Sequence, residues 1–236
     1  MPGLARALSK LGRCSRSRAV VLVREGRVKL NGRVRRDPET PVDLECDEIA
    51  IDDAPVAAAE RVYVMLNKPR GLVTTAADEL GRDTVYSCFD DPAMKRLPAV
   101  GRLDKASEGI LLFTNDNAWA NAITDPATHV DKTYHVHVAA LADDALIARL
   151  VEGVSDEGAR LNVKRASILR RGEKNSWLEI VLDEGRNRHI RRLLAAFDVE
   201  VLRLVRIAIG PLRLGDLRKG SWRRLTDAEV RALHAP

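Results

Sequence analysis

Short apolar segments separated by glycine, proline and polar residues recur along the whole chain. Six of them have the length and the apolar or alternating pattern of β-strands: 62–66, 109–113, 134–139, 161–169, 177–182 and 200–209. Three others repeat apolar residues at helical spacing: about 116–124, 142–152 and 187–197. Because strands and helices do not alternate regularly, we expect an α+β fold with a mixed, largely antiparallel sheet flanked by helices.

The first 51 residues predict a smaller module of two helices and a hairpin. Apolar residues repeat at helical spacing in two successive segments, and Ser15 or Ser17 can cap the second helix. A short alternating strand then runs into Asn31-Gly32, a dipeptide typical of two-residue hairpin turns. The pattern therefore predicts an independent unit ahead of the larger domain.

Charge supports the same division. Residues 1–36 carry eleven Lys or Arg and one acid, Glu25, whereas residues 37–60 carry nine acids and no base. A module with so large an excess of one sign favours a polyanionic partner. We expect three parts: a basic domain at 1–51, a linker at 52–60 and a second, larger domain at 61–236.

Composition narrows the class of protein. The chain has 236 residues, of which 45% are hydrophobic, enough for a core in one ordinary domain plus a small one. No run approaches ~18 consecutive apolar residues and the first residues lack an apolar signal core, so we expect a cytoplasmic protein with no membrane partner. The three cysteines are far apart, and neither GxGxxG nor GxxxxGK[ST] occurs, so we expect no disulfide framework, zinc site or nucleotide cofactor.

Asp104 is the strongest candidate for chemistry. It follows Arg102 closely and precedes the apolar strand at 109–113. A carboxylate there is costly to desolvate unless cations or hydrogen bonds stabilise it. Structural acids are common, but a stabilised carboxylate at such a position is also typical of catalytic sites.

Tyr134 belongs to a strand whose two faces differ. Lys132 opens this strand, and Tyr134 shares one face with valines while His135 and His137 share the other. The simple interpretation of Tyr134 is core packing. The two histidines lack a third nearby ligand, so we expect no metal there.

Two further segments contain basic residues beside structural ones. In 184–194 the apolar residues follow helical spacing and the arginines fall on the flanks, as they do in many solvated helices. Segment 67–71 contains Lys68, Pro69 and Gly71, which by itself favours a turn with an exposed lysine.

Taken in order, these motifs resemble the RsuA-type pseudouridine synthases. Segment 101–116 looks like the family signature GRLDxxTxGLLLLTND, 67–73 looks like NKPxGxxx, and 184–194 looks like EGxxRQ[IV]RRM. The chain departs from the last pattern at His189, where glutamine is usual, and at Leu193, where methionine is common. The basic module resembles the small RNA-binding domain shared by a small-subunit ribosomal protein, tyrosyl-tRNA synthetases and many pseudouridine synthases.

The resemblance implies an isomerase that converts uridine to pseudouridine in ribosomal RNA and needs no cofactor. Asp104 would be the catalytic carboxylate acting on a flipped-out uridine, and Tyr134 would pack against the base. Arg191 would pair with Asp104; Arg192 is the alternate because a one-residue offset is easy to make. Attack by Asp104 at the anomeric carbon and attack on the uracil ring both stay open. Eleven residues are expected to contact RNA: Arg13, Arg16, Arg18, Arg27, Lys29, Asn31, Lys68, Arg102, Lys132, Arg188 and Arg192.

Two other functions compete with this one. A non-catalytic RNA-binding ribosome-assembly factor could share the fold, but the presence of Asp104, Tyr134 and Arg191 argues against it. A serine hydrolase using Ser107 would need a GxSxG context that the chain lacks. We expect a monomer whose partner is a folded ribosomal RNA stem-loop or a pre-ribosomal particle. The choice between small- and large-subunit RNA stays open, and a tRNA target is less expected.

Overall fold

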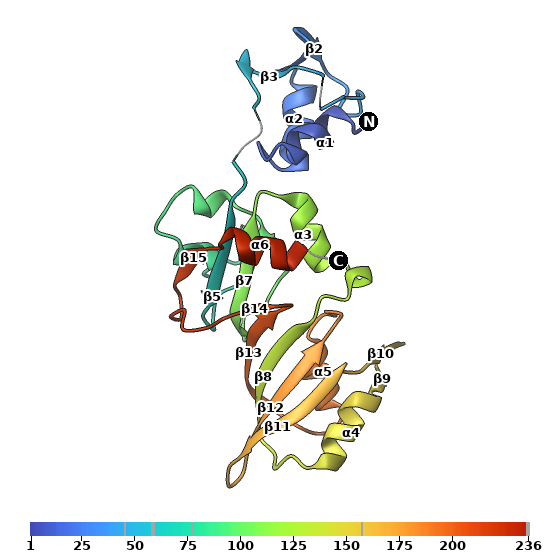
Figure 1. Ribbon diagram of the computed structural model, residues 1–236, viewed down its shortest axis with the longest axis vertical. Coiled ribbons are helices and arrows are strands. Elements are labelled where there is room, and N and C mark those ends of the chain that lie inside the picture. Colours follow the sequence, from blue (N-terminus) through green and yellow to red (C-terminus); the bar gives the residue numbers. More distant parts are fainter. Residues whose placement is uncertain (45, 58–59, 77, 157, 235–236) are drawn as a thin grey trace. The chain divides into compact units, whose positions relative to one another are not determined.

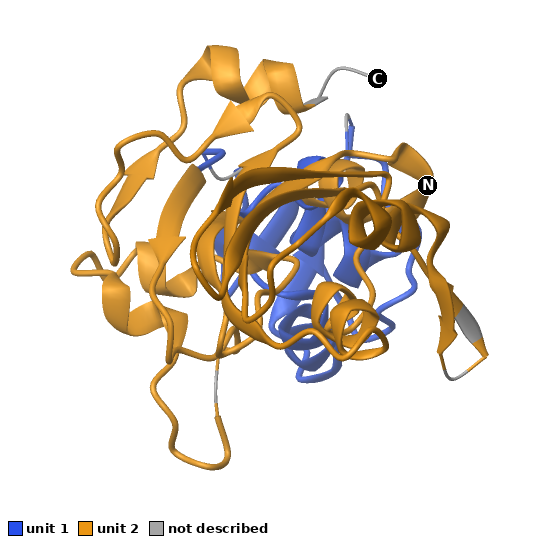
Figure 2. Cartoon of the chain, turned by 90° about the horizontal axis from the view of Figure 1, so that it is seen from below, with its two compact units in different colours: residues 1–62, 114–119 blue, residues 63–113, 120–236 orange. Residues whose placement is uncertain are grey.

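The computed structural model describes residues 1–236 except 45, 58–59, 77, 157 and 235–236 (Figure 1). It divides into two compact units, which Figure 2 colours separately: residues 1–62 with 114–119, and residues 63–113 with 120–236. None of the helices in the described ranges is long and apolar enough to cross a bilayer.

The first unit contains the two helices and the hairpin that the sequence predicts. Of the two candidate caps, Ser15 is the one used, because its Oγ accepts a hydrogen bond from the Arg18 amide at 3.2 Å. Asn31 and Gly32 have φ values of 51° and 75°, which suit a tight hairpin turn. The elements are α1 (Leu4–Lys10), α2 (Arg16–Arg24), β1 (Val28–Leu30), β2 (Arg33–Arg35), β3 (Ile49–Ile51) and β4 (Ala54–Pro55), with the sheet in the order β2-β1-β3-β4.

Strand β4 lies inside the segment 52–60 that we expected to be a linker. It pairs antiparallel with β3, and the amide of Val56 donates to the carbonyl of Ile49 at 2.8 Å, so the start of this segment is part of the basic unit's sheet. Residues 58–59 lie outside the described residues. The domain boundaries given above stay a prediction.

A single sheet forms the frame of the second unit. Its order is β11-β12-β8-β13-β7-β5-β15, with β14 pairing to β13 and β6 to β7. The strands are β5 (Tyr63–Lys68), β6 (Ala99–Val100), β7 (Glu108–Thr114), β8 (Lys132–Val138), β11 (Arg165–Arg171), β12 (Ser176–Leu182), β13 (Val201–Ile209), β14 (Leu212–Arg213) and β15 (Trp222–Arg224), and a separate hairpin contains β9 (Val154–Asp156) and β10 (Ala159–Leu161). The helices are α3 (Asn117–Thr124), α4 (Asp144–Glu152), α5 (His189–Ala195) and α6 (Asp227–His234), with 3₁₀ turns η1 (Val85–Cys88), η2 (Met94–Arg96) and η3 (Pro126–Thr128).

The predicted α+β class with a mixed sheet is confirmed. Strand β13 pairs parallel to β7 and antiparallel to β8, while β12 pairs antiparallel to both β8 and β11. Every residue of β7 is buried, as its continuous apolar sequence predicts. Strand β13 therefore joins the part of the sheet that contains β7 to the part that contains β8.

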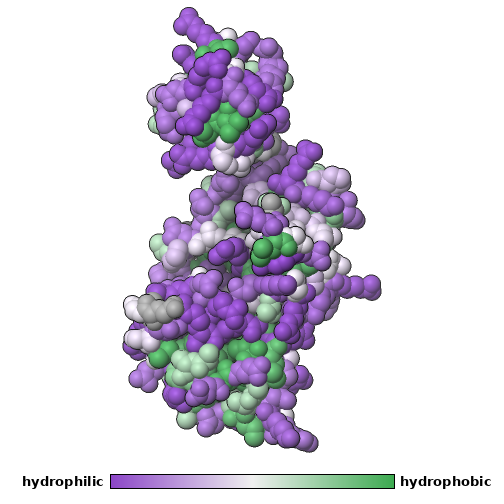
Figure 3. Space-filling model, turned by 180° about the vertical axis from the view of Figure 1, so that it is seen from behind, coloured by the Kyte–Doolittle hydropathy of each residue, from purple (hydrophilic) through white to green (hydrophobic). Residues whose placement is uncertain are grey.

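Helix α4 packs on the edge strand β11, and α5 packs against β13 and β9. Three large apolar side chains near that edge are exposed: Leu141, Val151 and Leu169. Figure 3 shows hydrophobic residues gathered over the part of the second unit that carries β11, β12 and α4. The opposite part of the sheet, around β13 and β7, holds the site described next.

Candidate active site

Asp104 lies in a turn that leads directly into buried strand β7. The Ser107 amide donates to the Asp104 carbonyl at 2.9 Å, which closes the turn. A neighbouring segment holds it from outside: the Gly71 amide donates to the Lys105 carbonyl at 2.8 Å, and the Thr74 hydroxyl donates to the Leu103 carbonyl at 2.8 Å. The turn is thus fixed on both sides of Asp104 by hydrogen bonds to its backbone carbonyls.

Lys68, at the end of β5, stabilises the same turn through hydrogen bonds to backbone carbonyls. Its Nζ donates to the carbonyls of Asp104 at 3.1 Å, Ser107 at 2.8 Å and Pro69 at 3.2 Å. Burial lowers the pKa of Lys68 to about 8, and the nearby charge of Asp104 opposes this shift. The prediction that Lys68 contacts RNA does not fit a side chain with 0% exposure. Lys68 is therefore a buried cation that stabilises the backbone of the turn.

Arg191, on α5, reaches the turn from the opposite direction. Its Nη2 donates to the carbonyl of Ala106 at 3.1 Å and its Nη1 to the carbonyl of Val201 at 3.1 Å. Burial, and then the charge of Arg188, lower the pKa of Arg191, while the charge of Asp104 raises it. The direct Asp104–Arg191 pair that we expected is absent among the described residues, where no ion pair involves the Asp104 carboxylate. Arg191 instead holds the backbone two residues beyond it.

Arg192 points to a different part of the unit. Its Nε donates to the Asp156 carboxylate on β9 at 2.7 Å. It does not line the pocket that contains Asp104, whereas Arg191 does. Of the two candidate arginines, Arg191 is the one that lines the pocket and contacts the Asp104 turn, but neither forms an ion pair with Asp104 among the described residues.

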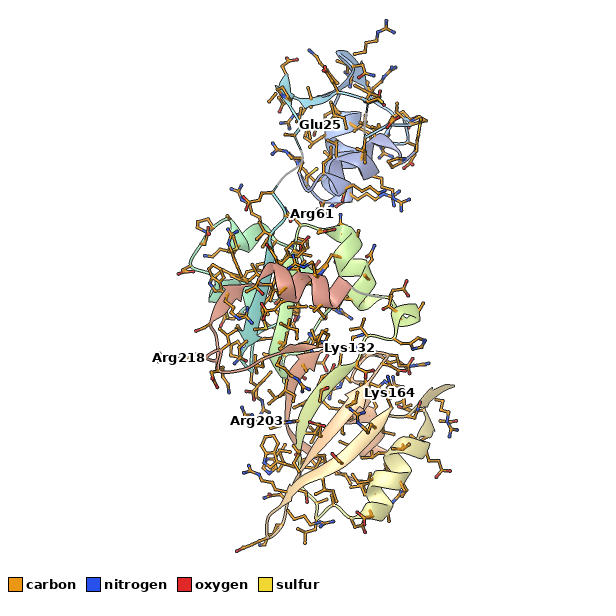
Figure 4. The ribbon with its side chains drawn as sticks, viewed as in Figure 1. Glu25, Arg61, Lys132, Lys164, Arg203 and Arg218 are labelled. Atoms are coloured by element: carbon orange, nitrogen blue, oxygen red, sulfur yellow. The ribbon has the colours of Figure 1, made fainter. Side chains whose placement is uncertain are left out.

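A pocket of about 330 Å³ opens in front of this turn, entirely within the second unit. The structure brings six of the predicted site residues to its wall from three separate segments: Arg102, Asp104, Lys132, Tyr134, Arg188 and Arg191. Figure 4 labels Lys132 at the start of β8, where its strand enters the pocket wall. Burial, and then the charge of Arg206, lower the pKa of Lys132.

Tyr134 is 9% exposed and sits on the pocket face of β8. In register it lies between Ile180 on β12 and Arg206 on β13. His135 and His137 face away, as the alternation predicts: His135 Nε2 lies 3.5 Å from Glu179, and His137 stacks on Trp177 with ring centroids 4.8 Å apart. An aromatic ring at the wall of a pocket suits a planar base.

His189 and Arg188 form the start of α5 at the pocket rim. Arg188 has a left-handed backbone with φ 49°, which is uncommon outside glycine. The His189 ring lies 2.9 Å from the carbonyl of Asn162 through Nε2, and burial lowers its pKa, so the neutral ring with a proton on Nε2 is favoured. The glutamine-to-histidine departure is therefore accommodated by a hydrogen bond to the backbone.

The charged pocket residues that were not predicted as site residues include Arg206 and Asp183. Arg206 occupies a strand that is otherwise largely apolar, and it is 7% exposed. A charged residue in such a strand is rarely buried without a partner. That contrast was the signal available in the sequence.

The basic unit presents its predicted RNA contacts in two groups. Arg13, Arg16 and Arg18 are exposed near the start of α2, and only Arg16 of these three has an ion pair, at 3.6 Å from Glu39, among the described residues. The hairpin residues are engaged locally: Arg27 with Asp52 at 2.5 Å, Lys29 with Asp53, and Asn31 with Asp47 at 2.7 Å. The acidic stretch after residue 36 thus covers part of the basic hairpin.

Comparison with known proteins follows the division of the chain. A family described as RNA pseudouridylate synthase matches residues 62–196, and the S4 domain family matches residues 3–49. The chain belongs to the RNA pseudouridylate synthase family. The predicted family and enzyme class are therefore confirmed.

Members of the pseudouridylate synthase family resemble this chain over nearly its whole length. An uncharacterized RNA pseudouridine synthase of Aquifex aeolicus is 38% identical over 227 residues, 96% of this chain and 91% of that protein. Ribosomal large subunit pseudouridine synthase B of Bacillus subtilis is 35% identical over 237 residues, 100% of this chain and 96% of that protein. A crystal structure of a pseudouridylate synthase superposes with a TM-score of 0.69 and 32% identity, covering 99% of this chain and 100% of that one. The second unit therefore has a pseudouridine synthase fold, and the first is an S4 domain.

Proposed function

We propose that this chain isomerises one uridine of ribosomal RNA to pseudouridine, with Asp104 as the catalytic carboxylate. The observation that carries the proposal is the convergence of Asp104 and Tyr134 on one pocket, with Arg191 fixing the turn that contains Asp104. Membership of the synthase family supports the reaction. The full-length similarity to a Bacillus subtilis protein named for the large ribosomal subunit supports ribosomal RNA as the substrate class.

The pocket is suited to a base that has left its RNA helix. A uridine cannot reach a carboxylate inside a pocket while it stays stacked, so the nucleotide must swing out. Tyr134 offers a stacking surface, which contributes roughly 1–3 kcal/mol per base in related settings. Arg102 and Arg188 at the wall would bind the phosphates that flank the extruded nucleotide.

The chemistry exchanges one bond for another on the same ribose. In the route through the anomeric carbon, a carboxylate oxygen of Asp104 bonds to C1′ as the C1′–N1 bond breaks. The electron pair of the C1′–N1 bond stays with the base. The base turns, C5 bonds to C1′, and the carboxylate leaves. The proton on C5 is then lost and N1 gains one, so the product is an isomer of the substrate. In the alternative route the carboxylate adds to the uracil ring first.

The exposed arginines near the start of α2 would supply affinity for the folded RNA around the target. Contacts of this kind fix position without reading sequence. They are expected to act together with the pocket, since a small pocket alone cannot choose one uridine among many. The basic unit therefore supplies binding and the second unit supplies chemistry.

Mapping of pseudouridine in ribosomal RNA tests the proposal. Cells that lack the gene would be complemented with the wild type, with Asp104→Asn, or with Asp216→Asn, a control at an exposed position away from the pocket. We expect one pseudouridine to disappear in the deletion and to return with the wild type and the control only. An unchanged map would refute ribosomal RNA as the substrate, and rescue by Asp104→Asn would favour a non-catalytic RNA-binding role.

A further inference from the structure

Arg206 is a buried cation at the pocket wall that the reaction described above leaves unused. Its side chain lies on β13, is 7% exposed and donates through Nε to the Ile110 carbonyl at 2.8 Å. Its Nη2 is buried and has no hydrogen-bond partner, and no ion pair involves Arg206, among the residues the structure describes. A buried guanidinium in this condition lacks the compensation that such groups normally have.

The position of Arg206 links it to the base. Arg206 pairs in register with Tyr134 on the neighbouring strand, and both residues line the pocket. Cross-strand partners point to the same face of a sheet, with Cβ atoms about 4.5–5.5 Å apart. A base stacked on the Tyr134 ring would therefore present an edge to the Arg206 guanidinium.

The surroundings of Arg206 are positive. Lys68 lies under the catalytic turn and Lys132 at the pocket wall, and the charge of Arg206 contributes to the lowered pKa of each, after the larger effect of burial. Arg191 also lines the wall, and its Nε is buried without a hydrogen-bond partner. Six lysines and arginines line the pocket against three acids, Asp104, Asp183 and Glu184, so its charged side chains are net positive. Such a field favours a ligand that carries or gains negative charge.

Uracil gains negative charge at one point of the reaction. When the C1′–N1 bond breaks, its electron pair stays with the base and spreads over N1, O2 and O4, while C1′ takes a carboxylate oxygen of Asp104. The charge disappears when C5 bonds to C1′ and the carboxylate leaves. A donor fixed at the edge of the base would stabilise this intermediate more than the neutral substrate, which is the condition for rate acceleration.

We propose that Arg206 is a second catalytic residue, whose free Nη2 donates a hydrogen bond to a carbonyl oxygen of the target uracil and stabilises the base as it detaches from ribose. This inference rests on the proposed function, because it needs a uridine in the pocket. It gives Arg206 a role distinct from that of Arg191, which acts on the turn and not on the base.

The test compares two substrates in single-turnover reactions of the full chain. A transcript carrying the mapped uridine is made with either uridine or 5-fluorouridine at that position. Fluorine withdraws electrons and stabilises a negatively charged base, so detachment of 5-fluorouracil depends less on Arg206. Loss of the N-linked nucleoside is measured by mass spectrometry of nuclease digests.

For Arg206→Gln we expect the rate on uridine to fall by about 10²–10³-fold, the usual effect of removing one such donor. The rate on 5-fluorouridine should fall by at least about tenfold less, and the affinity for RNA should change little. Arg206→Lys, which keeps the charge, should retain an intermediate rate. Arg203→Gln is the matched control: this arginine lies on the same strand, pairs with Glu108 at 2.9 Å and does not line the pocket (Figure 4).

The outcomes separate the two proposals. If the wild type leaves the uridine unchanged, the proposed function fails and this inference fails with it. If the wild type is active and Arg206→Gln stays within about threefold of it, only the inference fails. A folding defect would slow both substrates by the same factor and lower the unfolding temperature, and that pattern in both Arg206 variants would assign the residue a purely structural role.

Discussion

Lys68 donates a hydrogen bond from its buried ammonium to the backbone carbonyl of Asp104, at 3.1 Å. The same nitrogen reaches the Ser107 carbonyl, where the turn meets β7. The backbone of Asp104, the proposed catalytic residue, is thus held by a cation that has no exposed surface. This relationship makes the stability of the unit and the geometry of its site depend on one side chain.

Replacing Lys68 by methionine should therefore affect both properties. The substitution leaves three carbonyls without their donor, and we expect the free energy of unfolding to fall by about 2–4 kcal/mol. Activity should fall as well, because the turn loses its support. Urea denaturation and single-turnover assays measure the two effects. Lys105→Met, at an exposed position of the same turn, should leave stability within about 0.5 kcal/mol of the wild type.

The lowered pKa of Lys68 also predicts a pH dependence of stability. Its pKa is about 8 in the folded protein against 10.5 as the ordinary value, so between these limits the unfolded chain binds more protons. Stability contributed by Lys68 therefore rises from pH 8 to pH 10.5 and is constant below pH 8. The difference in unfolding free energy between the wild type and Lys68→Met should grow over this window. A difference that shrinks with rising pH would contradict the burial of the charged group.

Arg191 and Arg192 should differ in the kind of defect they cause. Arg191→Lys cannot hold the Ala106 and Val201 carbonyls together, and a displaced turn should slow single-turnover rates by about 10²-fold. Arg192→Lys weakens the contact with Asp156 and any RNA contact, and Arg192 does not line the pocket, so the change should alter the affinity for RNA and not the rate at saturation. A rate defect in Arg192→Lys, with only an affinity defect in Arg191→Lys, would show that Arg192 and not Arg191 supports the reaction.

Gly109 should tolerate no side chain. Its φ is +103°, and a Cβ there would overlap the carbonyl oxygen of Arg206 on the parallel strand. Gly109→Ala should destabilise the protein by about 3 kcal/mol or more, measured by thermal unfolding. Gly185→Ala meets no atom within 4 Å and should leave the unfolding temperature nearly unchanged.

The two groups of basic residues in the first unit should contribute differently to RNA binding. Arg18 is exposed without an ion pair among the described residues, so Arg18→Gln should reduce the slope of log affinity against log salt by about 1. Arg27 already pairs with Asp52, and Arg27→Gln should reduce it less. Fluorescence anisotropy at several salt concentrations measures both slopes. Equal changes of slope for Arg18→Gln and Arg27→Gln would indicate that RNA replaces Asp52 as the partner of Arg27 at little cost in free energy.

Local sequence patterns were sufficient to predict much of this fold, but not the buried side chain that stabilises the Asp104 turn. Strand β7 and the Asn31-Gly32 hairpin follow from apolar runs and turn residues, whereas the grouping of Asp104, Tyr134 and Arg191 was implied only by the family resemblance. The burial of Lys68 could not be predicted, because two of its three carbonyl partners lie 36 and 39 residues further along the chain. A lysine next to a Pro-Gly turn has the local sequence of an exposed residue.

The role of Arg206 was missed for a similar reason. Its environment depends on the parallel pairing of β13 with β7, which brings Arg206 beside Gly109 and Ile110. Nothing in the sequence of either strand indicates which partner it takes. The pairing of Lys29 with Asp53 was also unexpected, since the acidic segment was interpreted as a linker.

The place of β13 in the sheet has a consequence for synthesis of the chain. Within the described residues β13 is the strand that connects β8 to β7, and it ends at Ile209. A ribosome that has released only residues up to about 200 has therefore made the basic unit, Asp104 and Tyr134, but the two parts of the sheet have nothing to join them. The nascent chain would be able to hold RNA long before it could modify it, and catalytic competence would arrive in a single late step, when β13 enters the gap.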